Sequence, residues 1–459
     1  MKKFALAAAT GSVLGLLATT QIAGPLIAQE ADRNTTVYEQ LDLFGDIFER
    51  IRAQYVEEVD SAKLIEAAIN GMLTSLDPHS SYLSPDDADD MRVQTRGEFG
   101  GLGIEVTQQD GWVKVVSPMD GTPADAAGIQ SGDLITAVDG ESLMGYTLDE
   151  AVDLMRGPVG SEIVITVVRE GVSEPFDVSI IRDTIKLTAV RVRQEGESIV
   201  LRITTFNDQT MANLSDGLAK QIEEAGGIDK VNGIIVDLRN NPGGLLNQAV
   251  FVADAFLEEG EIVSTRGRNP QDGERFNATA GDLTSGLPMV VLINGGSASA
   301  SEIVAGALQD HDRALIVGTT SFGKGLVQSV YRLDGGYAIK LTTGKWYTPS
   351  GRSIQKERVL DATGNLIEVH PESLETEAQR RARPIFKSDG GRSLYGGGAI
   401  TPDVIVRYDT LTTAEQRLAR VLVPKSQDMY LAMDEYAFAQ KGALKPDFAV
   451  TDAMRNDLK

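Results

Sequence analysis

Two segments near the start of the chain carry apolar residues at helical spacing. The first holds Leu41, Phe44, Ile47, Phe48 and Ile51, and the second holds Leu64, Ala67, Ile69 and Leu73. This period predicts two helices between residues 38 and 76, and hence a small helical subdomain that we assign to residues 29–97. The Asp-Pro pair within residues 76–83 then breaks the helix. His79 in that loop is expected to be structural or solvated.

Residues 98–184 have the pattern of short strands with one or two helices between them. Apolar and polar positions alternate at 100–106 and at 132–140, and helical spacing recurs at 123–129 and 147–155.

A glycine turn opens this unit and is a candidate binding site for peptide tails. The turn consists of Gly101, Leu102, Gly103 and Ile104. Exposed N–H groups there could bind a terminal carboxylate, while the neighbouring strand edge accepts the peptide as an added strand. By itself the turn is weak evidence, because any glycine turn has this composition.

From residue 185 onwards, strand-like apolar runs alternate with helical segments. Strands are expected at 198–205, 233–238, 289–293 and 314–317, and helices at 208–225, 245–257 and 299–310. This alternation predicts an α/β core, which we assign to residues 185–405. Residues 361–398 are polar and rich in glycine, and are expected to form a surface excursion. Residues 406–459 predict a helical extension that is either a docking or dimerisation element or a surface helix.

Charge and cysteine content exclude several functions. The chain of 459 residues is long enough for two or three domains, and its net charge of −23 argues against nucleic acid and anionic membrane surfaces as partners. The absence of cysteine excludes a disulfide framework, thiol catalysis, a cysteine-ligated zinc and a lipoprotein anchor. We expect neither a metal nor a cofactor.

The first residues have the composition of an export signal. Lys2 and Lys3 precede an apolar run from Phe4 to Ala28, and no acidic residue occurs before Glu30. Residues 1–28 are therefore expected to direct export, with an uncleaved membrane anchor as the alternative. Either interpretation places the body of the protein in the periplasm or cell envelope.

One stretch predicts a nucleophile at the start of a helix. The segment from Asn294 to Asp310 predicts a glycine turn followed by a helix that begins at Ser299. The first N–H groups of a helix have no partner within it, so the amide of Ala300 could hold an oxyanion formed on a carbon bonded to the serine. The segment Ser299-Ala-Ser-Glu302 also fits a capping box, in which the hydroxyl only satisfies a helix amide.

A serine nucleophile needs a base, and histidine is scarce in this chain. His311 follows Ser299 by twelve residues, which is about 18 Å along one helix and too far for a hydrogen bond. Lys324 lies between two glycines and among apolar residues, where desolvation favours the neutral amine. Gln328 could orient it, although four residues span about 13 Å on a straight strand, so the backbone must bend. Taken alone, Lys324 would sooner be a solvated loop lysine.

Three motifs carry a resemblance to a known family. They are Gly-Ser-Ala-Ser-Ala-Ser-Glu-Ile at 296–303, Val-Gly-Thr-Thr-Ser-Phe-Gly-Lys-Gly-Leu-Val-Gln at 317–328 and Lys-Leu-Thr-Thr-Gly-Lys-Trp-Tyr-Thr-Pro-Ser-Gly-Arg-Ser-Ile at 340–354. The chain resembles the carboxyl-terminal processing proteases, the S41 family of serine peptidases, from about residue 38 to about residue 405.

The resemblance implies roles for particular residues. Members of the family use a serine, a lysine twenty-five residues later and a glutamine four beyond that, which maps onto Ser299, Lys324 and Gln328. It also implies a second oxyanion donor in the turn that follows the strand at 233–238, where Gly243 or Gly244 is the candidate. Without the family, that turn is as readily an ordinary strand-to-helix loop.

The resemblance also implies an architecture. The expected fold is α+β and multidomain: the N-terminal helical subdomain, a PDZ domain over residues 98–184, an α/β protease core of the ClpP/crotonase-like type, and the helical C-terminal extension. Expected partners are protein substrates with exposed C-termini and further copies of the chain, joined through N- or C-terminal helices. An adaptor protein is a further candidate partner, and nucleic acid is not expected.

Two function classes follow. The first is a serine endopeptidase with a Ser-Lys dyad that binds substrate tails in its PDZ domain, and the second is a non-catalytic scaffold that only binds tails. A core that only packs has no need for a serine, a lysine and a glutamine at these spacings, which favours the peptidase. Arg156 is a candidate gate between the PDZ domain and the core. Its simpler role is to place a cation at the negative end of a helix dipole.

Overall fold

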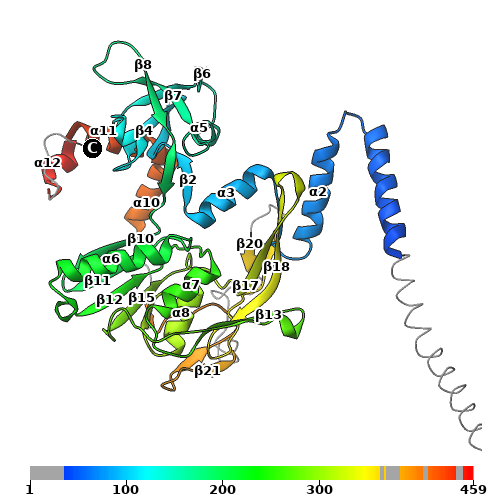
Figure 1. Cartoon of the computed structure of the whole chain (residues 1–459), viewed down its shortest axis with the longest axis vertical. Coiled ribbons are helices and arrows are strands. Elements are labelled where there is room, and N and C mark those ends of the chain that lie inside the picture. Colours follow the sequence, from blue (N-terminus) through cyan, green and yellow to red (C-terminus); the bar gives the residue numbers. More distant parts are fainter. Residues whose placement is uncertain (1–35, 362–365, 369–382, 407–411, 441–447, 458–459) are drawn as a thin grey trace, which may run out of the picture. The chain divides into compact units, whose positions relative to one another are not determined.

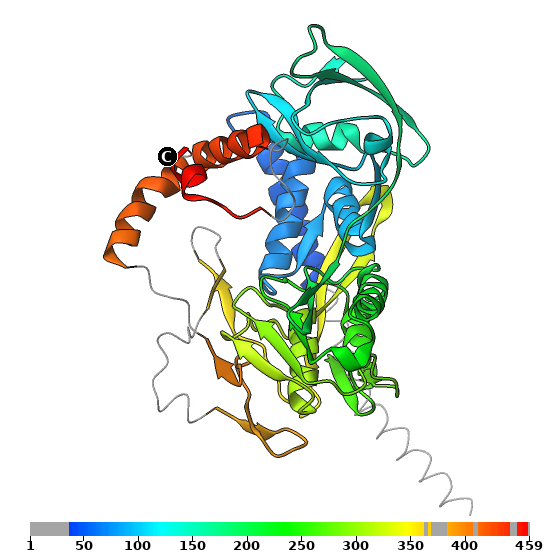
Figure 2. The ribbon, with the colours of Figure 1, turned by 90° about the vertical axis from the view of Figure 1, so that its left-hand side faces the viewer.

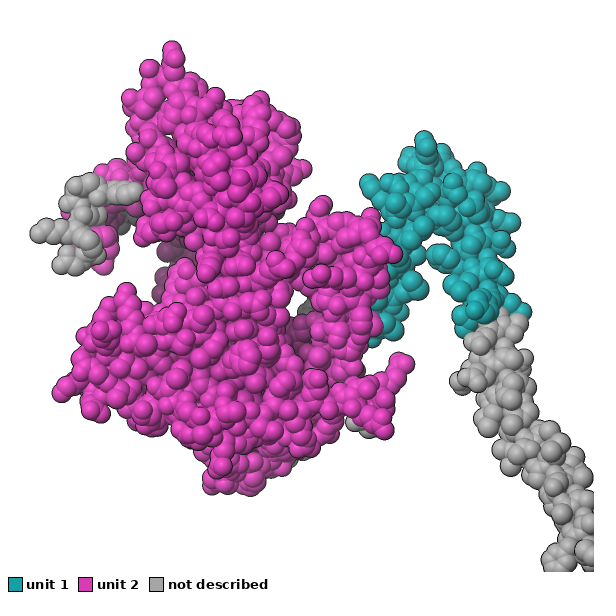
Figure 3. All heavy atoms as spheres, in the orientation of Figure 1, with its two compact units in different colours: residues 1–77 teal, residues 78–459 magenta. Residues whose placement is uncertain are grey.

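The computed structural model describes most of the chain in five stretches, 36–361, 366–368, 383–406, 412–440 and 448–457. The chain forms two compact units, residues 1–77 and 78–459, which Figure 3 colours separately. The expected export signal lies outside the described residues. Within the five stretches, no helix has the length and apolarity needed to cross a membrane.

The described part of the first unit consists of helices, as the apolar period predicts. Residues 36–54 are helical, and α2 (Ser61–Thr74) follows after a short turn. Asp60 caps α2, because its carboxylate accepts a hydrogen bond from the amide of Ala62 at 2.8 Å. Of the side chains on α2, only Leu73 is buried within the chain.

The second unit begins with a strand and a helix, β1 (Ser81–Leu83) and α3 (Pro85–Arg96). Hydrophobic spacing does not reveal α3, because most of its residues are polar. Its ends do carry signals: Ser84 and Asp87 form a capping box, Pro85 occupies the first turn, and Gly97 ends the helix in the left-handed conformation with φ +67°.

A small sheet and two helices follow α3. The sheet strands lie in the order β3 (Ile104–Gln109), β4 (Trp112–Pro118), β5 (Leu134–Val138), β7 (Glu162–Val168) and β8 (Phe176–Ile181), and β6 (Glu141–Ser142) pairs with β5. The helices are α4 (Pro123–Ala126) and α5 (Leu148–Met155), and β2 (Glu98–Gly101) pairs with β9 (Asp183–Lys186) outside the sheet. Strand β3 is at the edge of its sheet, so one side of it is open to a further strand.

The region that we assigned to residues 185–405 is built on a six-stranded sheet. Its order is β10 (Val190–Glu195), β11 (Ser198–Ile203), β12 (Gly233–Asp237), β15 (Met289–Ile293), β16 (Leu315–Gly318) and β23 (Val404–Ile405). Only the β10–β11 pair is antiparallel. Helices α6 (Thr210–Glu224), α7 (Leu246–Asp254) and α8 (Ala300–Asp310) lie close to the predicted bounds (Figure 1). Because β12 and β15 are parallel neighbours, the turns that follow them meet at one edge of the sheet.

A second sheet contains β17 (Leu326–Arg332) and β18 (Ala338–Tyr347), the two strands that follow Lys324 in the chain, together with three strands from earlier parts of the chain. Its path is β1, β18, β13 (Glu261–Gly267) and β14 (Arg275–Asn277), and β17 pairs with β18. The pairing of β1 with β18 sets Ser81 opposite Lys340. The segment before α3 is therefore fixed to the core by sheet hydrogen bonds.

We predicted that residues 361–398 form a surface excursion. That prediction is wrong for residues 383–398, which pack on the core. The region from 361 to 398 follows the hairpin strand β19 (Arg358–Leu360) and contains β20 (Leu366–Glu368), β21 (Ile385–Lys387) and β22 (Ser393–Tyr395). Leu394 is buried, and the amide of Asp389 donates to the carbonyl of Asp310 at 2.9 Å. The ring of His311 also contacts Asp389, at 2.7 Å through Nδ1. Long-range polar contacts that leave no mark in the local sequence hold this segment on the core.

The C-terminal extension is helical, as predicted. It contains α10 (Thr413–Leu422), α11 (Ser426–Gln440) and α12 (Asp452–Asp457). Helix α11 lies against the small sheet, where Nζ of Lys114 approaches a carboxylate oxygen of Asp434 at 3.1 Å (Figure 2). The described residues thus confirm the α+β multidomain fold with its helical N-terminal part, two sheet-containing regions and helical tail.

The buried ion pair between Arg352 and Asp310 generates a stability prediction. Both side chains are almost fully buried, and their closest N and O atoms are 2.6 Å apart. Arg352→Ala leaves the carboxylate buried without its partner, so the free energy of unfolding should fall by about 3–5 kcal/mol. Arg193→Ala is the matched control, because its pair with Glu195 is exposed and should be worth less than about 1 kcal/mol. Urea unfolding followed by far-UV circular dichroism measures both. Equal losses in the two variants would contradict the prediction.

Candidate active site

Ser299 lies at the N-cap of α8 in a strained backbone conformation. Its φ is +54° and its ψ is −110°, a region that residues other than glycine seldom occupy and that costs about 1–3 kcal/mol. Hydrogen bonds hold it there: its amide donates to the carboxylate of Glu302 at 2.8 Å, and its carbonyl accepts from the amide of Ile303 at 3.0 Å. Strain of this kind concentrates at functional sites, where the surrounding structure maintains it.

Ala300, the first residue of α8, has a backbone N–H group that is free to bind a ligand. Among the residues that the structure describes, the amide of Ala300 has no hydrogen-bond acceptor. It therefore has the free N–H group that the start of a helix predicts.

The two flanking serines are buried, and their hydroxyls are engaged. Oγ of Ser297 donates to the carbonyl of Leu238 at 2.8 Å, and Oγ of Ser301 donates to the carbonyl of Asn241 at 3.0 Å. Both hydroxyls fix the turn after β12 to the start of α8. Neither serine lines the cavity described below.

Glu302 is fully buried at the centre of the site, and the sequence reasoning treated it only as part of a cap. Its carboxylate accepts four hydrogen bonds, from the amides of Ser299, Gly323 and Lys324 and from the hydroxyl of Ser321, at 2.5 to 2.9 Å. Burial raises the pKa of this carboxyl, although the four donors oppose that shift. One side chain thus fixes the backbone of Ser299 and the backbone of Lys324.

Lys324 is held by a chain of two further hydrogen bonds. Its Nζ donates to Oε1 of Gln328 at 2.9 Å, and Nε2 of Gln328 donates to the carbonyl of His79 at 2.7 Å. The lysine precedes β17, and the pairing of β17 with β18 shifts register between Val327 and Gln328. This bulge bends the strand, so the two side chains meet despite the four-residue separation. Sequence reasoning missed the His79 contact, because it uses a backbone carbonyl, which any residue has.

The turn after β12 lies directly against Ser299. A Cβ atom built on Gly243 would be 2.9 Å from Cβ of Ser299, so only glycine allows this approach. The amide of Gly243 donates to Oδ1 of Asn241 at 2.9 Å. The amide of Gly244 has no acceptor among the described residues. Of the two candidate donors, Gly244 is therefore the one with a free N–H group here.

These residues line one cavity of about 810 Å³. It brings together the candidate catalytic side chains and the candidate backbone donors, which are Ser299, Lys324 and Gln328, and Ala300, Gly243 and Gly244. Apolar side chains form much of its remaining wall, among them Phe206, Leu246, Phe276, Ile303, Val327 and Trp346. Three residues of α3, Met91, Gln94 and Thr95, also line it.

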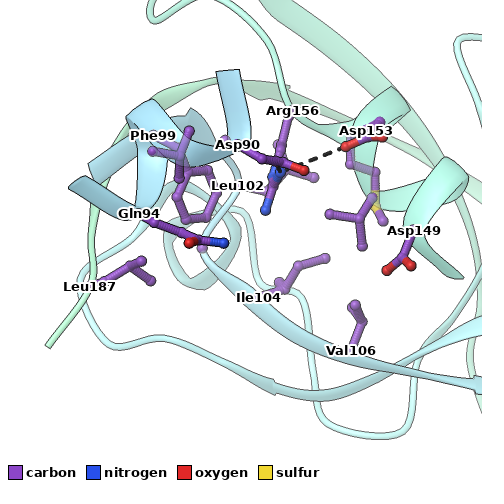
Figure 4. Close-up of a pocket in the computed structure, with 15 residues that line it drawn as sticks. Asp90, Gln94, Phe99, Leu102, Ile104, Val106, Asp149, Asp153, Arg156 and Leu187 are labelled. Atoms are coloured by element: carbon purple, nitrogen blue, oxygen red, sulfur yellow. Dashed lines mark hydrogen bonds and ion pairs between the residues drawn. The ribbon is translucent and has the colours of Figure 1, made fainter. Parts of the chain in front are cut away.

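The glycine turn of the small-sheet region lines a separate groove. The groove has a volume of about 500 Å³ and lies between β3 and α5 (Figure 4). Gly101, Leu102, Gly103 and Ile104 contribute to its wall, and among the described residues the amides of Leu102 and Gly103 have no acceptor. The groove thus offers free N–H groups beside an open strand edge, as tail binding requires.

Arg156 lies at the end of α5 but contacts α3 rather than residues 185–405. Its Nη1 is 2.9 Å from Asp90 on α3 and 3.6 Å from Asp153 on α5. Its guanidinium also lies over the ring of Phe99, at 5.1 Å. The carbonyls at the end of α5 are capped by another residue, because Arg182 donates to the carbonyls of Met155 and Leu154.

Nothing among the described residues resembles a metal centre, since no group of three or more His, Asp or Glu side chains is placed to hold an ion.

Comparisons with known proteins match three parts of the chain. The family model "Peptidase family S41" matches residues 198–362, a PDZ domain model matches 114–169, and the model "Activating protease CtpB N-terminal domain" matches 11–87.

Curated relatives cover most of the chain. A carboxy-terminal-processing protease of Bartonella bacilliformis is 57% identical over 329 residues, which span 72% of this chain and 75% of the relative. A probable CtpA-like serine protease of Staphylococcus aureus is 36% identical over 348 residues, which span 75% of this chain and 68% of the relative. Among solved structures, a photosystem II D1 C-terminal processing protease is 27% identical, with a TM-score of 0.40 over 84% of this chain and 97% of that one.

Glu302 generates a prediction for this site. Glu302→Gln keeps the size of the side chain but turns an NH2 group towards two of the four donors, which leaves both without an acceptor. We expect the free energy of unfolding to fall by about 1–3 kcal/mol and peptidase turnover to fall with it. Glu224→Gln, the same change on an exposed part of α6, should stay within about 0.5 kcal/mol of the wild type. Denaturant unfolding and a peptidase assay on the same preparations test this. Full stability and turnover in Glu302→Gln would show that the four bonds do not matter.

Proposed function

This chain belongs to the carboxy-terminal-processing proteases of peptidase family S41 and is a serine peptidase, and we propose that Ser299 is its nucleophile, Lys324 its general base and Gln328 the residue that orients the lysine. The observation that carries this proposal is the shared cavity, which is lined both by a strained serine and by a lysine held by Gln328. Both residues are fixed through one carboxylate, that of Glu302.

The proposed reaction is acyl transfer. Oγ of Ser299 attacks the carbonyl carbon of the scissile peptide bond, and its proton passes to neutral Nζ of Lys324. The tetrahedral intermediate collapses, the C–N bond breaks, and the lysine returns the proton to the leaving amine. Water then attacks the acyl-serine carbonyl and gives a proton to the lysine. The ester bond to Oγ breaks, the lysine returns that proton to Oγ of Ser299, and the new carboxyl terminus leaves.

The free amides of Ala300 and Gly244 are the proposed oxyanion donors, with Gly243 as the alternative to Gly244. Both free N–H groups belong to residues that line the cavity. Donors already in place when the oxyanion develops need no reorganisation, which is why such groups lower the barrier most effectively.

Substrate selection is the proposed role of the PDZ groove. The free amides of Leu102 and Gly103 bind the terminal carboxylate of a protein substrate, and the tail lies along β3 as an added strand. The alternative of a non-catalytic scaffold is not favoured, because the relatives that cover most of the chain are proteases.

We further propose that the protein works outside the cytoplasm, in the periplasm or cell envelope, since residues 1–28 have an export-signal composition. Cell fractionation with an antibody to the full chain tests this. Recovery in the cytoplasmic fraction would contradict it.

The dyad predicts two knockouts and a pH profile. Ser299→Ala and Lys324→Ala should each abolish cleavage while the protein stays folded, because each removes a reacting group from the wall of an open cavity. Lys220→Ala, an exposed lysine on α6, should keep wild-type activity. Wild-type turnover should rise with pH as the lysine loses its proton. Retention of more than about a hundredth of turnover in both knockouts, or a rate that falls steadily from mildly acidic to mildly alkaline pH, would refute the dyad.

Arg156 is proposed to couple tail binding to the active site. Arg156 contacts Asp90 on α3, and α3 also lines the catalytic cavity. A change in how the PDZ domain packs on α3 can therefore shift the α3 wall of that cavity, and tail binding can favour one packing over another. Arg156→Ala should lower turnover of tail-bearing substrates by a larger factor than it lowers their affinity, because Arg156 also lines the tail groove. Affinity and turnover are measured in one preparation. Equal loss of both would mean that Arg156 only supports the PDZ fold, and unchanged turnover would remove it from the mechanism.

Self-association through the N-terminal helices is the last proposal. Apolar side chains there are exposed, including Tyr38 at 67%, Leu41 at 58%, Phe44 at 50% and Ile47 at 51%. Such a stripe on one helix is typical of an interface with another helix. Sedimentation velocity should therefore show an oligomer that Leu41→Asp together with Phe44→Asp dissociates. A wild-type monomer at micromolar concentration would exclude it.

A further inference from the structure

The groove that we assign to substrate tails has a wall that does not belong to the PDZ domain. Besides β3 and α5, it is lined by three residues of α3: Asp90, Val93 and Gln94. Figure 4 shows Asp90 and Gln94 beside the part of the groove that contains Leu102. Helix α3 precedes the PDZ domain in the chain, so an isolated PDZ domain would lack this wall.

The charged groups of the groove are largely committed to each other. Arg156 is paired with Asp90 and Asp153, so its charge is already balanced where it lies. Asp149 adds a further carboxylate to the lining. A terminal carboxylate that enters this groove therefore meets more acidic than basic groups, and it needs neutral donors to be held.

Gln94 can supply such donors. Its side chain is exposed, lines the groove and has no hydrogen-bond partner among the described residues. An amide NH2 group carries two donors and no charge. It can therefore bind a carboxylate while Arg156 stays paired with Asp90 and Asp153.

We propose that Gln94 is a further ligand for the terminal carboxylate of the substrate, acting together with the free amides of Leu102 and Gly103. The proposal rests on the tail recognition proposed above and adds a recognition residue from outside the PDZ domain. Gln94 also lines the cavity that contains Ser299 and Lys324. The side chain that reads the end of the tail is thus part of the wall of the catalytic cavity.

The test compares a free carboxylate with its amide. Two fluorescent peptides of identical sequence, with an apolar last residue and either a free or an amidated C-terminus, are titrated into the full chain in a Ser299→Ala background, which prevents hydrolysis. Gln94→Ala should weaken binding of the free acid about tenfold, on the order of 1.4 kcal/mol, and leave the amidated peptide unchanged. Gln94→Glu should weaken the free acid further, because it sets two like charges together.

Two further variants control for effects on the fold and on α3 in general. Arg92→Ala removes a side chain of α3 that lines neither the tail groove nor the catalytic cavity, so it should bind both peptides as the parent does. Gln94→Asn keeps the amide and shortens the side chain by one methylene, and it reports whether position 94 tolerates change without loss of fold. Thermal unfolding of each variant accompanies the titrations.

The outcomes separate the two proposals. If Gln94→Ala weakens the acid and the amide equally, or neither, Gln94 does not bind the carboxylate and this inference is wrong, while tail recognition stands. If the parent binds neither peptide, or binds both with equal affinity, the groove does not recognise a terminal carboxylate. The proposed tail recognition then fails, and this inference fails with it.

Discussion

The arrangement of the site depends on one buried carboxylate. Glu302 accepts hydrogen bonds from the backbone of Ser299 at the start of α8 and from the backbone of Gly323 and Lys324 in the loop before β17. Burying a carboxylate costs free energy unless hydrogen bonds compensate it, so the geometry that supplies all four donors to Glu302 is favoured over any other approach of the two segments. The strained conformation of Ser299 and the position of the lysine backbone follow from this one constraint.

A second constraint comes from residues 79–96, which precede the PDZ domain in the chain. The carbonyl of His79 holds Gln328, β1 adds a strand to the sheet that carries β17 and β18, and α3 lines both the tail groove and the catalytic cavity. The lysine side chain is therefore oriented by a segment that continues directly into the wall of the tail groove. A hydrogen bond, a strand pairing and the chain itself thus connect the proposed base with the proposed tail groove.

Much of the fold could be predicted from local sequence, and the exceptions have physical causes. Strand β15 and helix α8 follow their apolar patterns closely, because a buried parallel strand and a core helix need nearly continuous apolar residues. Helix α3 escaped notice because it is polar on nearly every face, and only its caps mark it. The resemblance to the S41 family, carried by the spacing of Ser299, Lys324 and Gln328, identified three residues that share a cavity. It could not show that Glu302 also holds the backbone of Lys324, or that the carbonyl of His79 holds Gln328, since those contacts join residues far apart in sequence. Nor could it show that the amide of Gly243 donates to Asn241, because the side chain of Asn241 is itself held by the carbonyl of Ile203 on another strand.

The central claim is that Ser299, and neither neighbouring serine, is the nucleophile that Lys324 activates. The most direct measurement is to treat the full chain with a serine-reactive acylating probe and to map the adduct by mass spectrometry, in the wild type and in Lys324→Ala. We predict a single adduct on Ser299 in the wild type and its loss in the lysine variant. An adduct on Ser297 or Ser301, or undiminished labelling of Ser299 without the lysine, would contradict the account.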